Sequence, residues 1–92
     1  MIKEAEIAIV SAVSKALELL NKNPNISSEE IIQEVMSDVK AESTAKIAAI
    51  ASVNNAIKLK RYDKTMTDRQ ITQQAVSDYK KFLIENSEED NL

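Results

Sequence analysis

The 92-residue chain contains no cysteine, histidine or glycine, and Pro24 is its one proline. Without cysteine it can form no disulfide or thiolate metal site. Without histidine it lacks the commonest acid–base group and metal ligand. Glycine supplies the positive φ angles that tight hairpins and phosphate-binding loops need. These absences argue against a metalloenzyme, a P-loop protein or a dinucleotide-binding protein, and they favour an all-helical chain for which we expect no cofactor and no metal.

Long apolar runs are also missing. No stretch of the sequence approaches 18 apolar residues, so no transmembrane helix is expected. Residues 1–6 include acidic side chains, whereas a secretory signal has a basic start and a continuous apolar core. We therefore expect a cytoplasmic protein that does not associate with a membrane. A chain of this length makes a single domain with a small core.

The formal net charge of −3 is unevenly distributed. Residues 1–46 carry five basic and eight acidic side chains. Residues 47–84 carry seven basic and three acidic side chains, and residues 85–92 carry four acidic ones. The second part of the chain is therefore basic, between an acidic first part and an acidic end. The polar stretch 86–92 is predicted to be a disordered tail.

The sequence contains an internal repeat with a period of 40 residues. Residues 5–40 align without a gap on residues 45–80, and 11 of the 36 pairs are identical. A fixed period of 20–50 residues is typical of a repeated supersecondary unit. Two copies are too few for a solenoid, so the repeat predicts two tandem αα-hairpins that pack against each other.

Each copy also has the same helix-start signal. Ser27 is followed three residues later by Glu30, which is the pattern of a capping box, and Ile26 with Ile31 forms a hydrophobic staple around it. The second copy has equivalent residues rather than identical ones: Met66, Thr67, Gln70 and Ile71. This equivalence supports duplication more strongly than the identities do.

Apolar periodicity predicts a helix over about 2–22, one that follows Ser27, and others over about 44–61 and 68–85. Ser43 or Thr44 can cap the third of these, although a single long helix through residues 40–44 is an open alternative. The first and third segments are rich in alanine and serine, which lets helix axes approach closely. We therefore predict an all-α four-helix bundle in which these two segments pack against each other.

One candidate site is a polar stripe that both copies share. It comprises Gln33, Ser37 and Lys40, and in the second copy Gln73, Ser77 and Lys80. Residues at this spacing lie on one face of a helix. The stripe could be a paired recognition surface, but the simpler interpretation is a duplicated solvent-exposed face or a set of hydrogen bonds between packed helices.

A second candidate is a basic segment that could contact an anionic partner such as a nucleic acid. It comprises Lys58, Lys60, Arg61, Lys64 and Arg69. Lysine and arginine supply most of the affinity for phosphates, and the helix after this segment could act as the reader of a helix-turn-helix. The simpler interpretation is that basic residues at the end of a helix complement its dipole. The connection is also longer than the usual three or four residues.

The function that the sequence favours is a non-catalytic protein–protein interaction or assembly module that forms a homodimer. Surplus apolar residues in the first copy predict the interface: Ile7, Leu19, Leu20 and Ile32. In the second copy Leu20 corresponds to Lys60 and Ile32 to Thr72, so the surplus is expected mainly on the first copy. An enzyme is not expected, because no carboxylate pair lies in a setting that would separate two pKa values, and no small-molecule substrate is evident. The alternative is nucleic-acid binding through the basic segment.

Overall fold

The computed structural model describes residues 2–39 and 43–90, and within them the side chains of residues 5–39 and 44–83. The described chain forms four α-helices and no strand, which confirms the predicted all-α fold. They are α1 (Ile2–Lys22), α2 (Ser28–Asp38), α3 (Ser43–Tyr62) and α4 (Asp68–Asp90). Helices α2 and α3 are separate, because the backbone at Val39 is extended.

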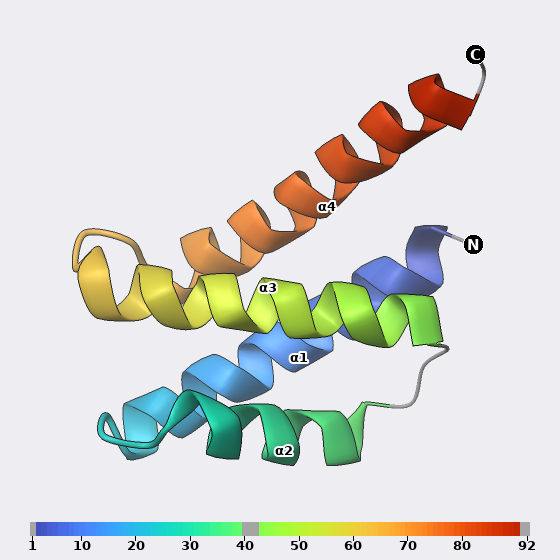
Figure 1. Ribbon diagram of the computed structural model, residues 1–92. Helices are drawn as coiled ribbons and strands as arrows, with labels where there is room; N and C mark the ends of the chain where they lie inside the picture. The colour runs from blue at the N-terminus through green and yellow to red at the C-terminus, as the bar shows by residue number, and fades with distance from the viewer. Residues whose placement is uncertain (1, 40–42, 91–92) are drawn as a thin grey trace.

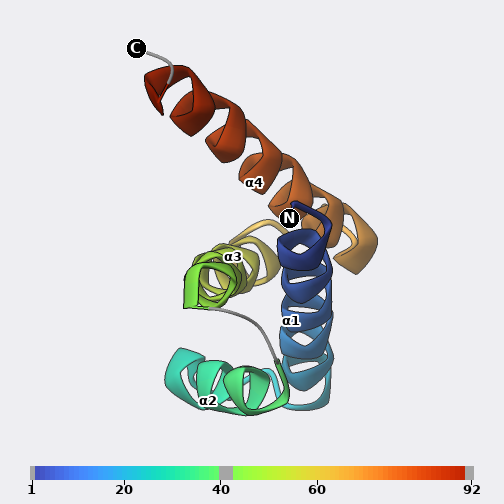
Figure 2. The ribbon, with the colours of Figure 1, turned by 90° about the vertical axis from the view of Figure 1, so that its right-hand side faces the viewer.

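Helices α1 and α3 form the central pair of the bundle, and they run in the same direction (Figure 1). Helix α2 lies on one side of this pair and α4 on the other, and the two outer helices do not pack against each other (Figure 2). The predicted close packing of α1 and α3 is confirmed, since these two helices share the most extensive contact in the described chain.

Small residues explain that close contact. Alanine occupies much of the buried stripe of both central helices: Ala5, Ala8, Ala12, Ala16, Ala45, Ala49 and Ala56. Short side chains allow helix axes to lie near the lower end of the usual 8–10 Å separation. Larger side chains, among them Ile9, Val13, Ile31, Val53 and Ile71, fill the space on either side and are fully buried.

Two connecting loops have the same local hydrogen bonds at a spacing of 40 residues. Asn23 Oδ1 accepts from the N–H of Asn25, and Asp63 Oδ1 accepts from the N–H of Thr65. At the helix starts, Ser27 Oγ and Thr67 Oγ1 each accept from the backbone N–H three residues later, at 3.1 Å in both cases. Both predicted N-caps are therefore confirmed. The superposition of the two whole hairpins stays a prediction.

The outer helices differ in length, which the repeat does not predict. Helix α2 ends at Asp38, whereas α4 continues to Asp90 and extends away from the other helices (Figures 1 and 2). Helix α4 thus continues past the end expected near residue 85, as far as Asp90. The predicted tail 86–92 stays a prediction, and residues 91–92 lie outside the described chain. No proline or glycine interrupts the sequence there, so local sequence does not end the helix.

Candidate functional site

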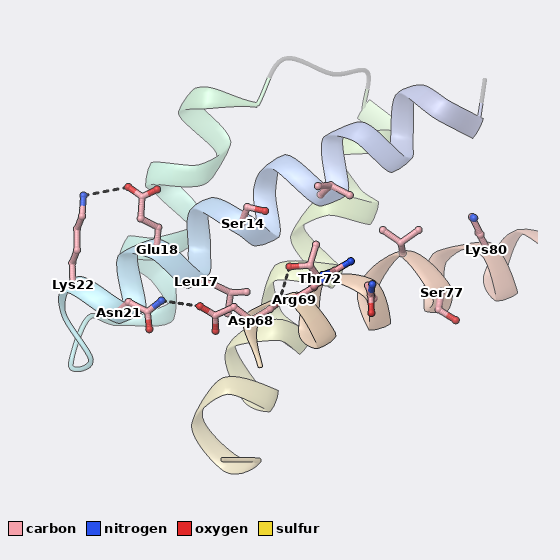
Figure 3. Close-up of a pocket in the computed structure, with 13 residues that line it drawn as sticks. Ser14, Leu17, Glu18, Asn21, Lys22, Asp68, Arg69, Thr72, Ser77 and Lys80 are labelled. Carbon is pink, nitrogen blue, oxygen red and sulfur yellow. Dashed lines mark hydrogen bonds and ion pairs between the residues drawn. The ribbon is translucent and has the colours of Figure 1, made fainter. Parts of the chain in front are cut away.

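A surface groove with a volume of about 930 Å³ lies between α1 and α4 (Figure 3). Val10, Leu17 and Val76 supply its apolar lining. The polar side chains of its walls come from both helices: Ser14, Glu18, Asn21 and Lys22 of α1, and Asp68, Arg69, Thr72, Gln73, Ser77 and Lys80 of α4. An apolar lining with a polar rim is the composition expected of a docking surface.

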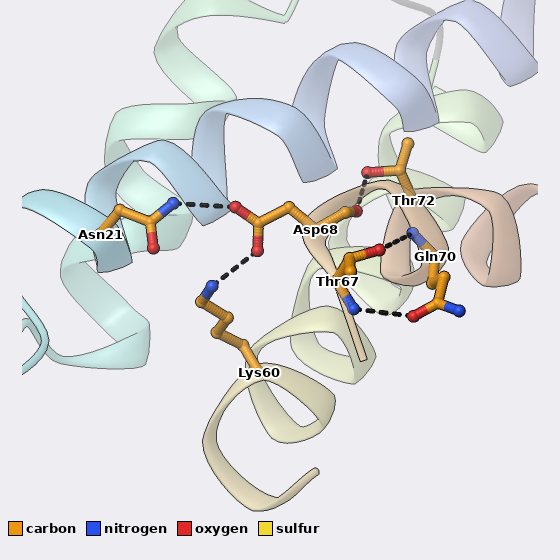
Figure 4. A network of polar contacts seen from close by, with 6 residues as sticks. All are labelled: Asn21, Lys60, Thr67, Asp68, Gln70 and Thr72. Atoms are coloured by element: carbon orange, nitrogen blue, oxygen red, sulfur yellow. Dashed lines mark hydrogen bonds and ion pairs between the residues drawn. The ribbon is translucent and has the colours of Figure 1, made fainter. Parts of the chain in front are cut away.

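Polar contacts between α1 and α4 mark the two ends of the groove. At the start of α4, Asn21 Nδ2 donates to Asp68 Oδ2 at 2.8 Å (Figure 4). Towards the other end, Lys80 Nζ lies 3.8 Å from Glu6 Oε1. Between these contacts the lining of the groove includes Ser14 and Thr72, which have short side chains.

Asp68 is the centre of the polar network at the start of α4 (Figure 4). Lys60 Nζ donates to its Oδ1 at 2.6 Å, in addition to the bond from Asn21. These hydrogen bonds, that from Lys60 first, hold the pKa of the Asp68 carboxyl below its ordinary value against the opposing effect of burial. The network thus joins α1, α3 and α4 at one point, and Asp68 also suits the positive end of the α4 dipole.

The charges along the groove are mostly paired within the described chain. Lys22 pairs with Glu18 at 3.2 Å, and Asp68 pairs with Lys60. Arg69 is exposed and has no hydrogen bond or ion pair among the described residues, and Lys80 makes only the long contact to Glu6. Among the described charges of the groove, Arg69 on α4 is therefore the unmatched one.

The expected exposure of Leu20 in the apolar interface of the first copy is wrong, whereas the interface itself stays a prediction. Leu20 is only 4% exposed, because it lies on the buried stripe of α1. Leu19 and Ile32 are half-buried and pack against the core, whereas Ile7 is 68% exposed.

The expected excess of exposed apolar residues in the first copy is also wrong. Ile47 occupies the position equivalent to Ile7 and is equally exposed, at 68%. Tyr62 of the second copy is exposed as well, as is Phe82 beyond its end. The difference between the copies lies instead in the groove, which only α1 and α4 line.

The basic segment is divided between structural contacts and surface. Lys60 is held by Asp68, and Arg61 Nη2 donates to the carbonyl oxygen of Ile26 at 2.5 Å, which ties α3 to the loop before α2. Lys58, Lys64 and Arg69 remain exposed. Two of the five cations thus have intramolecular partners, which leaves less charge for an anionic partner.

The polar stripes of the two copies lie on different sides of the molecule, because α2 and α4 flank the central pair. Gln73, Ser77 and Lys80 line the α1–α4 groove. Gln33 and Ser37 are exposed on α2, where Ser37 Oγ donates to the carbonyl oxygen of Glu34. Lys40 lies outside the described residues. The stripes do not form one paired surface, and the α4 stripe belongs to the groove.

Sequence reasoning missed the groove itself. Helix periodicity places Val10 beside the buried stripe of α1, yet Val10 is 40% exposed. The pairing of α1 with α4 across 47 residues, as in the Asn21–Asp68 bond, has no local signal in the sequence. The repeat predicts the pairing of α1 with α4 only under one further assumption. That assumption is that the outer helix of one copy packs on the central helix of the other copy.

The described side chains contain no cluster of three or more acidic residues able to hold a metal ion, and no buried polar atom among them lacks a hydrogen-bond partner. Besides Asp68, the pKa of Asp63 is lowered, and hydrogen bonds from Thr65 account for it. Among the described helices, none combines the length and apolar character needed to cross a membrane. Comparison of the chain with protein-family models, with curated proteins and with solved structures gives no match.

Proposed function

We propose that the protein is a non-catalytic assembly module that forms a homodimer through the α1–α4 groove. The observation that carries this proposal is the groove itself, an open channel of about 930 Å³ with apolar residues from two helices. Burial of apolar surface is the main favourable term in protein association. A small helical domain that leaves such a channel open gains free energy when a second chain covers it.

Val10 gives the sharpest test, because it lines the groove and is 40% exposed. We expect the full chain to sediment as a dimer at micromolar concentration, and Val10→Ser to weaken the dimer while the helical content stays the same. Ile47→Ser is the matched control, since Ile47 lies exposed on α3 and does not line the groove.

Three outcomes decide the proposal. Weaker association of Val10→Ser with unchanged association of Ile47→Ser supports it. A strict monomer up to about 100 μM, a concentration far above the Kd of ordinary specific complexes, overturns it. Binding of duplex DNA by such a monomer, with the steep salt dependence of phosphate contacts, would favour the basic segment as the functional surface.

A further inference from the structure

Few buried side chains hold helix α4 on the central pair. Among the described side chains of α4, Ile71 and Ala75 are the buried ones, and an alanine has little apolar surface to bury. The residue of α2 that corresponds to Ala75 in the repeat is Val35, which is larger and fully buried. Burial of apolar surface is the main term that holds an outer helix on a bundle, so α4 gains less from these positions than α2 does.

The α4 wall of the groove also carries smaller residues than the equivalent face of α2. Ile32 and Met36 of α2 are partly buried and pack against the core. The corresponding residues of α4 are Thr72 and Val76, which line the groove. Side chains beside unfilled space lose the dispersion contacts that larger neighbours would make, so the contact between α1 and α4 is incompletely packed.

Polar side-chain contacts hold α4 at the two ends of the groove. Asp68 accepts hydrogen bonds from Asn21 and Lys60 at the start of the helix (Figure 4). Towards the other end, Lys80 lies 3.8 Å from Glu6. All five side chains are exposed or partly exposed, and contacts of this kind contribute little each. They join separate helices, so they can break while every helix keeps its backbone hydrogen bonds.

The connection before α4 has local hydrogen bonds of its own. Asp63 Oδ1 accepts from the N–H of Thr65, and Thr67 Oγ1 accepts from the N–H of Gln70. Neither bond involves α1, so both persist when α4 moves away from α1. Residues 63–67 are therefore suited to act as a hinge on which α4 moves as an intact, capped helix.

We infer that α4 is a lid that opens about residues 63–67 while α1, α2 and α3 stay folded, and that a second copy in the groove holds it closed. Opening uncovers Leu17, which is 2% exposed and lines the groove. Elements that move open at a lower free energy than the whole fold. A second copy that covers the groove contacts both α1 and α4, so it binds the closed form and lowers the open population. This coupling rests on the self-association proposed above, whereas the opening of α4 does not.

Hydrogen–deuterium exchange of the full chain, followed by mass spectrometry, tests the opening. At a concentration where the chain is monomeric, the amides of residues 72–80 in α4 should be protected at least about tenfold less than those of residues 9–17 in α1, because they exchange through the smaller opening. Equal protection of the two segments would contradict the inference.

Two matched variants separate opening of α4 from global unfolding. Ile31→Val and Ile71→Val remove the same methylene at equivalent, fully buried positions of α2 and α4. Ile31→Val should speed exchange in α1 and α3 by about two- to tenfold and leave α4 unchanged, because α2 and α4 do not pack against each other. Ile71→Val should speed exchange in α1, α3 and α4 by that factor, because every open form lacks its contacts. If Ile31→Val speeds exchange in α4 as much as in α1, α4 opens only with the whole chain and the inference is wrong.

The coupling to a second copy is tested by repeating the exchange at higher protein concentration. When the free chain reaches ten times the dimer Kd, exchange of residues 72–80 should slow about tenfold, and Val10→Ser should reduce this effect. A chain that dimerises without slower exchange in α4 overturns the coupling. A wild-type chain that stays monomeric overturns the proposed function, and the exchange of α4 in that monomer still decides whether α4 is a lid.

Discussion

Lys60 Nζ lies 2.6 Å from Asp68 Oδ1, and this ion pair joins the end of α3 to the start of α4. Both side chains are partly exposed, so we expect a coupling free energy of about 0.2–1 kcal/mol, the range for such pairs. The check is a double-mutant cycle of Lys60→Met and Asp68→Asn, followed by urea unfolding. A coupling of zero would mean that the pair is not formed in solution.

The stability contributed by Asp68 should depend on pH. The pKa of Asp68 is lowered in the folded state, by the bond from Lys60 and then by that from Asn21. A lowered pKa contributes stability that is full above the unfolded value of about 3.9 and is lost as the pH falls through the folded pKa. Asp68→Asn removes this contribution, so its deficit in unfolding free energy should shrink as the pH is lowered from 6 towards 2.

The cause of that shift can be tested separately by NMR titration of the Asp68 carboxyl carbon. In Lys60→Met the pKa of Asp68 should move back towards its ordinary value, because the largest cause of the shift is gone. The same titration curve in both proteins would contradict the assigned cause.

Removal of either helix cap should destabilise the fold. Ser27→Ala and Thr67→Ala each leave a first-turn N–H without its side-chain acceptor, at an expected cost of about 0.5–2 kcal/mol. Ser37→Ala is the control, because Ser37 lies within α2 and bonds only a carbonyl of its own helix, and alanine has the higher helix propensity. Urea melts of the three variants measure this, and equal midpoints for all three would disprove the capping role.

The α1–α3 contact should not tolerate a larger residue. Ala49 is fully buried on α3, and Ala49→Leu forces extra volume into the close contact between the central helices. We expect a loss of about 1–3 kcal/mol, typical of overpacking. Ala51→Leu makes the same change at an exposed position of the same helix and should be nearly neutral. Equal effects in thermal melts would show that the helices are not closely packed at Ala49.

Leu20→Lys should unfold or strongly destabilise the protein rather than affect association alone. Leu20 is buried, and the truncation of a buried leucine already costs about 2–5 kcal/mol before any charge is introduced. Ile7→Lys is the matched control at an exposed position of α1, with an expected effect within about 0.5 kcal/mol. A folded Leu20→Lys chain with normal stability would show that this residue is not in the core.

The sequence alone determined the helical elements and where α2 and α4 begin. The starts of α2 and α4 were predicted because capping is local: Ser27 and Thr67 bond an N–H only three residues away. The contact of α1 with α3 was predicted as well, because a stripe of alanines allows the axes of two helices to approach closely. The all-α fold followed from these patterns together with the absence of glycine.

Only the tertiary structure decided which side chains are available to a partner. Lys60 and Arg61 are adjacent cations in the sequence, but their partners, Asp68 and the carbonyl of Ile26, lie 8 and 35 residues away. The α1–α4 groove likewise depends on the angle at which α4 crosses α1. Such angles result from packing between distant segments, for which helix periodicity carries no information.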